Sequence, residues 1–130
     1  MSNEFRGVGN AGDDAALKTV IVANEENQVA ELRVYFDEHP SAHPSDTAKD
    51  GGFWLDVTVW GDRHAAEVAQ HVKKGTRVHV VGRLAEHRWT VTATGETRSA
   101  MHLNADRVYL ALTRVAEVKF DAPRRRSGAN

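Results

Sequence analysis

The alternation of apolar and polar residues from Phe53 to Gly61 predicts a β-strand whose two faces differ in character. One row is apolar and is expected to face the core: Phe53, Leu55, Val57 and Val59. The other row is expected to face solvent, because it contains Asp56 and Thr58. This second row also carries Trp54 and Trp60, two of the three tryptophans in the chain, so these tryptophans need an explanation other than core packing.

Two strands are predicted before this one. Residues 4–20 alternate weakly and are interrupted by glycines, which predicts a bent opening strand. Residues 27–36 alternate clearly, with Leu32, Val34 and Phe36 on the inward face. Residues 39–52 contain prolines and glycines without periodicity, so we expect a long exposed loop there.

The period changes to that of a helix between Gly61 and Gly75. Apolar residues recur there at helical spacing, at Ala65, Val68, Ala69 and Val72. Asp62 is the predicted N-cap, and Gly75 is predicted to follow the C-terminal turn. The pattern predicts one amphipathic helix of about three turns.

Two long strands are predicted after the helix. Residues 76–89 place Val78, Val80 and Leu84 inward, with a bulge or bend at Gly82. A polar connection around Gly95 leads into the last strand. The apolar phase of that strand slips after Ala105, which predicts a bulge near Asp106 and Arg107.

The order of these elements predicts an all-β dominated fold. A single helix between the third and fourth of five strands is the element order of the OB-fold barrel, which binds oligonucleotides or sugars on a sheet face.

Composition bounds the class of protein. A length of 130 residues with 41% hydrophobic residues fits one globular domain, and we expect it to occupy residues 1–120. Residues 121–130 are expected to form a short, basic, disordered tail. We expect a cytoplasmic location because the chain shows neither a secretory signal nor a membrane span. The absence of cysteine excludes disulfides, thiolate metal sites and cysteine nucleophiles.

The charge is divided unevenly along the chain. Residues 1–56 carry 4 basic and 11 acidic residues, whereas residues 57–130 carry 13 basic and 7 acidic residues. A basic second half favours a polyanionic partner, unless the charges intermix on folding. His39 and His43 have a metal-ligand spacing, but Pro40 and Pro44 exclude the helix that would bring them together, so we expect neither a metal nor a cofactor.

Several motifs resemble those of bacterial single-stranded DNA-binding proteins. They are Trp54 followed by the aromatic-glycine pair Trp60-Gly61, the Lys-Lys-Gly turn at 73–75, Gly-Arg-Leu at 82–84 and Arg88-Trp89. Gly9-Asn10, Asp13 and Leu17-Lys18 are also similar to the opening pattern of that family, and the resemblance extends from about Phe5 to Phe120. Asp14-Ala15-Ala16 replaces the family's usual Pro-Glu. The sequences of residues 5–18 and 51–63 together suggest a divergent branch, of the kind carried on integrative conjugative elements.

The resemblance implies a non-catalytic protein that binds single-stranded DNA cooperatively and without strong sequence preference. It also implies homo-oligomers, usually homotetramers, and roles in DNA replication, recombination and repair, or in conjugative transfer on a mobile genetic element. The usual acidic C-terminal tip is missing, because the sequence ends in "PRRRSGAN", so we expect no recruitment of replication or recombination proteins through such a tip.

Tryptophans and basic residues are the expected binding groups, because bases stack on aromatic rings and cations follow the phosphates. The candidate residues are Trp54, Trp60, Trp89, Tyr35, Arg33, Arg77, Arg83, Arg88, Arg98 and Lys73. Two alternatives stay open. The first is an OB-fold adaptor acting through protein contacts, with its aromatics buried between subunits. The second is a small hydrolase or nuclease that uses His102 and Asp106.

Overall fold

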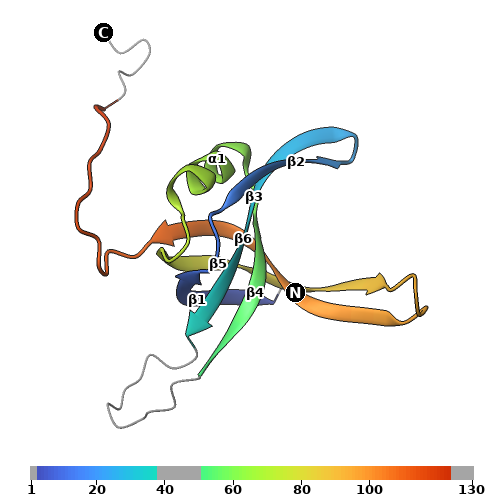
Figure 1. Ribbon diagram of the computed structural model, residues 1–130. Coiled ribbons are helices and arrows are strands. Elements are labelled where there is room, and N and C mark those ends of the chain that lie inside the picture. Colours follow the sequence, from blue (N-terminus) through green and yellow to red (C-terminus); the bar gives the residue numbers. More distant parts are fainter. Residues whose placement is uncertain (1–2, 38–50, 124–130) are drawn as a thin grey trace.

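The computed structural model describes residues 3–37 and 51–123, which form six strands and one helix (Figure 1). The strands are β1 (Glu4–Ala11), β2 (Ala16–Val22), β3 (Glu25–Asp37), β4 (Gly52–Val59), β5 (Arg77–Thr90) and β6 (Thr97–Leu110). Most of the predicted loop 39–52, including His39 and His43, and most of the predicted tail lie outside the described residues.

The six strands form one sheet, in which β1, β5, β6, β4 and β3 close into a ring and β2 extends from β3; this confirms the predicted OB-fold barrel. The strand order is β1-β5-β6-β4-β3-β2, and an additional pairing of β1 with β3 closes the ring. β4 and β6 run parallel, whereas the other neighbours are antiparallel. Figure 1 shows the strands wrapped around a common interior, with the helix α1 at one end.

The predicted opening strand is two strands, so the count is six rather than five and the helix follows the fourth strand instead of the third. β1 pairs with β5 and with the end of β3, whereas β2 pairs with the first half of β3. Between them, the Gly12 amide donates to the Arg33 carbonyl and the Ala15 amide donates to the Val72 carbonyl. These bonds hold the bend at Gly12 and Asp13 that separates β1 from β2, both of which pair with β3.

The inward rows predicted from the sequence form the core. The buried side chains include Leu32, Val34, Phe36, Leu55, Val57, Val59, Val78, Val80, Leu103, Ala105 and Val108. Phe53 is the exception in its row, since it is exposed at the end of the barrel. Its ring still contacts Phe5 and Phe36, with centroid distances of 6.3 and 5.9 Å.

The helix α1 (Asp62–His71) buries Ala65 and Val68 against the barrel, as the helical spacing predicted. The predicted N-cap is wrong, because Gly61 occupies that position and the Asp62 carboxylate instead accepts a hydrogen bond from the Gln28 amide. The predicted C′ position of Gly75 is also wrong, because the helix has Val72 as its C-cap and Gly75 lies in a separate turn closed by a hydrogen bond from the Thr76 amide to the Lys73 carbonyl. At ten residues, this helix is far shorter than a membrane crossing needs, and no other helix occurs among the described residues.

The predicted bulge lies at Asp106. Val81 pairs with Arg107 but Gly82 pairs with Ala105, so β6 has one extra residue at this point. Gly82 on β5 lies against the backbone of β6 at this bulge, and a Cβ atom there would clash with the backbone of Asn104 and Ala105. Beyond the barrel, β5 and β6 continue as a two-stranded hairpin arm, residues 85–101, which projects away from the other strands (Figure 1).

The buried position of Leu103 generates a stability prediction. Leu103→Ala leaves a cavity in the core and is expected to lower the free energy of unfolding by about 2–5 kcal/mol. Met101→Ala, two residues away on the same strand but half exposed, is the matched control and is expected to cost less than about 1 kcal/mol. Urea denaturation at one fixed protein concentration measures both, and equal losses would contradict this account of the core.

Candidate nucleic-acid interface

Trp54 lies within a cluster of side chains on the outer surface of the barrel. Its indole contacts the Tyr35 ring at a centroid distance of 5.2 Å, and the Arg33 guanidinium lies 5.1 Å from the indole centroid. The cluster follows from strand register, because Tyr35 is opposite Trp54 and Arg33 is opposite Asp56. Trp54 is still 46% exposed, so one side of this aromatic cluster is open to a ligand.

Trp60 follows the last residue of β4 and is held by a side chain from β6. Its Nε1–H donates to the Asn104 Oδ1 atom at 3.1 Å, while 37% of the residue remains exposed. Asn104 was missed from the sequence. Its hydrogen bond to Trp60 depends on the parallel pairing of β4 with β6, which places Asn104 opposite Thr58. No local sequence pattern predicts that pairing.

Thr58 was expected to face solvent, but it is only 7% exposed. It belongs to the outer row of β4, where the His102 side chain from β6 reaches it. Thr58 Oγ1 and His102 Nε2 lie 2.8 Å apart and share a hydrogen bond. The outer row is therefore partly covered in its middle and open at its two tryptophans.

The hairpin arm extends this surface. The His87 and Trp89 rings stack with centroids 5.6 Å apart, and Trp89 is 41% exposed. The cross-strand partner of Trp89 is Arg98, and the partner of Asn104 is Arg83, so both arginines project on the same side as the tryptophans. We call this surface the tryptophan face; it comprises Tyr35, Arg33, Trp54, Trp60, Arg83, Trp89 and Arg98 together with His87, His102 and Asn104.

Three predicted residues lie apart from the tryptophan face. Arg88 projects from the opposite side of the arm, where its cross-strand partner is Ser99. Hydrogen bonds from Arg88 and Ser99 hold the pKa of the exposed Glu86 carboxyl below its ordinary value. Lys73 follows the helix, and its ammonium donates to the Ala69 carbonyl. Arg77 begins β5 and pairs with Asp37 and Asn10.

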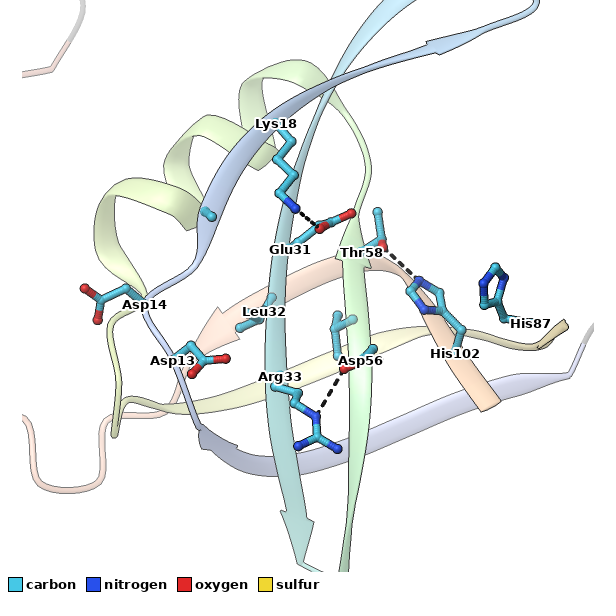
Figure 2. Close-up of a pocket in the computed structure, with 12 residues that line it drawn as sticks. Asp13, Asp14, Lys18, Glu31, Leu32, Arg33, Asp56, Thr58, His87 and His102 are labelled. Atoms are coloured by element: carbon cyan, nitrogen blue, oxygen red, sulfur yellow. Dashed lines mark hydrogen bonds and ion pairs between the residues drawn. The ribbon is translucent and has the colours of Figure 1, made fainter. Parts of the chain in front are cut away.

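A groove of about 510 Å³ runs beside Arg33 on the tryptophan face (Figure 2). Its two cations are paired with carboxylates, Lys18 with Glu31 at 2.7 Å and Arg33 with Asp56 at 3.2 Å. Asp13 and Asp14 add two further carboxylates to the lining. Residues 3–37 and 51–123 contain no cluster of three or more potential ligands that could hold a metal ion. The face as a whole offers exposed aromatic rings with arginines beside them, which is the chemistry of single-strand recognition.

Comparison with known proteins identifies relatives of the chain. The family model described as "Single-strand binding protein family" matches residues 3–111. The chain is 36% identical over 104 residues to a single-stranded DNA-binding protein of Corynebacterium glutamicum. That alignment covers 78% of this chain but 44% of the relative, so the chain spans less than half the length of the curated relative that it matches.

The Asn104–Trp60 hydrogen bond generates a prediction that needs no ligand. In a Trp54→Phe, Trp89→Phe background, Trp60 is the remaining tryptophan, so the tryptophan fluorescence comes from this residue alone. Asn104→Ala is expected to lower its fluorescence anisotropy, because the indole loses the acceptor that fixes its orientation. Asn27→Ala, which alters an asparagine on the β2–β3 hairpin, is the control. An unchanged anisotropy in Asn104→Ala would show that other contacts hold the ring.

Proposed function

The chain belongs to the single-strand binding protein family, and we propose that it binds single-stranded DNA without strong sequence preference. The observation that carries the proposal is the tryptophan face, on which Trp54, Trp60 and Trp89 are each between one third and one half exposed. Partly exposed indoles are costly to leave in water and are well suited to stacking. Because every base presents a π-face, such stacking tolerates any sequence and contributes about 1–3 kcal/mol per base.

Arginines on the same face supply the contacts to phosphate. Arg83 and Arg98 are more than half exposed, and their nearest carboxylates, on Asp106 and Glu96, lie 3.7 and 3.2 Å away. Exposed ion pairs of this kind contribute about 0–1 kcal/mol, so a phosphate can replace the carboxylate at little cost. Binding is therefore expected to weaken as salt rises, with a slope of about 0.7 per phosphate contact.

The groove beside Arg33 favours bases over phosphates at the protein surface. Its carboxylates outnumber its Lys and Arg side chains, since the lining contains Lys18 and Arg33 but four acidic residues, Asp13, Asp14, Glu31 and Asp56. A phosphate placed there would meet local repulsion, whereas a base is neutral and can stack on Trp54. We infer that the DNA strand lies with its bases toward the barrel and its phosphates toward Arg83 and Arg98.

The opposite side of the barrel supports self-association. A shallow groove of about 480 Å³ crosses β1, β5 and β6, with Val8 and Val81 half-buried and Tyr109 exposed on its lining. This mostly apolar strip, whose lining also includes Arg6 and His79, is separate from the tryptophan face, so a second copy can cover it while DNA remains bound. We infer a homo-oligomer, a dimer or tetramer, that protects single strands during cytoplasmic replication, recombination, repair or conjugative transfer.

A non-catalytic role also fits the contacts of the two residues that an enzyme hypothesis would use. His102 is hydrogen-bonded to Thr58, whereas Asp106 lies at the bulge and pairs with Arg83. The two side chains thus have separate partners and do not form a shared acid–base pair. Absence of metal-dependent cleavage of a labelled oligonucleotide would agree with this role.

Trp54→Ala is expected to lower the affinity for a dT oligonucleotide by about 1–3 kcal/mol because one stacking platform is lost. Phe120→Ala removes an even more exposed aromatic residue outside the barrel strands and is the matched control, with no expected change. Intrinsic fluorescence during titration with poly(dT) measures both, and binding is expected to quench the wild-type emission. Full affinity in Trp54→Ala would remove that residue from the site, and absence of quenching in wild-type protein would favour the adaptor alternative.

The two arm arginines offer a matched comparison of the two sides. Arg98 and Arg88 are both exposed and each pairs with a glutamate two residues away, but only Arg98 shares a side with Trp89. Arg98→Gln is expected to reduce the magnitude of the slope of log affinity against log salt by about 0.7, whereas Arg88→Gln is expected to change this slope less. Equal reductions would mean that the strand contacts both sides of the arm.

A further inference from the structure

A second groove, of about 530 Å³, lies at the start of β5, beyond the tryptophan face. Its lining brings together hydrogen-bonding and basic side chains from four parts of the chain. They are Asn10 on β1, His71 at the end of α1, Thr76 and Arg77 at the start of β5, and Thr113 and Arg114 after β6. We call this site the basic groove. It holds two guanidinium groups and contains no Asp or Glu among its lining residues.

The basic groove is connected to Trp54 by a row of side chains across four adjacent strands. Trp54 on β4 is opposite Tyr35, Tyr35 on β3 is opposite Asn10, and Asn10 on β1 is opposite Arg77 on β5. Two side-chain contacts confirm that the row shares one side, the Tyr35–Trp54 ring contact and a hydrogen bond of 3.3 Å from Arg77 to Asn10. At about 4.8 Å between strands, the row spans about 14 Å. This is about four nucleotides of a stacked strand, which rises about 3.4 Å per nucleotide.

The segment that carries Arg114 is fixed in place. The Ala111 amide donates to the Arg77 carbonyl at 2.9 Å, which anchors the segment to β5. The Val115 amide donates to the Leu112 carbonyl, closing a turn in which Arg114 has a φ of 67°. Arg114 therefore stands at the corner of an anchored turn beside Arg77, rather than on an unattached tail.

The charges in and around the basic groove differ from those of the groove beside Arg33. Arg77 pairs with Asp37 from β3, and both side chains are partly exposed. Within residues 3–37 and 51–123, Arg114 forms no ion pair. An anion that enters the basic groove thus meets one guanidinium with no carboxylate partner among the described residues, and a second one whose carboxylate partner it can replace.

We propose that the basic groove binds a phosphodiester group of the strand whose bases stack at Trp54, a step that rests on the proposed function. Arg114 and Arg77 would hold the phosphate, and the Thr113 and Thr76 hydroxyls are the available neutral donors. Thr113 and Arg114 lie beyond residues 3–111, the part of the chain that the family model matches. The proposed site therefore combines Thr76 and Arg77, which lie inside the matched region, with two residues that lie outside it.

Arg114→Gln tests the proposal through the salt dependence of binding to a long dT oligonucleotide. The slope of log affinity against log salt is negative, and its magnitude is expected to decrease by about 0.7, the value for one lost phosphate contact on a single strand. Arg114→Lys retains the charge and is expected to keep the wild-type slope. Arg63→Gln, an exposed arginine at the other end of the helix, removes the same charge and is expected to leave the slope unchanged. Thermal unfolding of each variant verifies that the fold is intact.

A second pair of variants tests Arg77. Asp37→Asn removes the carboxylate that competes for Arg77 and is expected to raise the affinity more than Glu67→Gln, which removes the carboxylate paired with Arg63. If wild-type protein binds dT but Arg114→Gln and Arg63→Gln have the same slope, the basic groove is not part of the DNA path, although the proposed function stands. If wild-type protein does not bind dT at all, the proposed function itself fails.

Discussion

The alternation of side chains across a closed sheet is the constraint on which the rest of this structure depends. On β4, Leu55, Val57 and Val59 fill the interior, and this fixes Trp54 and Trp60 on the outside. A register slip of one residue would place the indoles in the core and the aliphatic residues in water, so core packing alone specifies where the aromatic rings lie. Core packing of the barrel thus determines on which side the tryptophan face lies.

The extra residue at Asp106 extends the same principle to β6. Before the bulge, Leu103 and Ala105 point inward and Asn104 points outward; after it, Val108 points inward. A regular strand would have turned Val108 toward solvent. The bulge therefore allows one strand to reach Trp60 through Asn104 and still complete the core on the far side of the barrel. Gly82 belongs to this arrangement, because no side chain fits where it approaches Asn104 and Ala105.

Periodicity in the sequence was sufficient for the core rows, the helix, the bulge and the outward tryptophans, because each depends on neighbours along the chain. The features it missed depend on pairing between distant strands. The burial of Thr58 and the anchoring of Trp60 both require β6 beside β4, 44 residues away in sequence. The separation of Arg88 from Trp89 was open to prediction, since adjacent residues on a strand point to opposite sides. The division of the opening strand into β1 and β2 could not be predicted, because the bend after Gly12 is held by backbone hydrogen bonds to β3 and to the end of the helix.

The pairing of charges on the tryptophan face explains how a protein of net charge −1 can be suited to a polyanion. Arg33, Arg83 and Arg98 each have a carboxylate within 3.7 Å, so the face of the free protein carries little uncompensated positive charge. A polyanion without bases to stack would exchange one set of ion pairs for another and gain little, because exposed pairs contribute about 0–1 kcal/mol. A single strand of DNA gains the stacking energy in addition, and a duplex cannot offer its bases in this way. On the proposed function, the paired charges therefore make stacking on the tryptophans the condition for binding, which is how such a surface selects single strands over other polyanions.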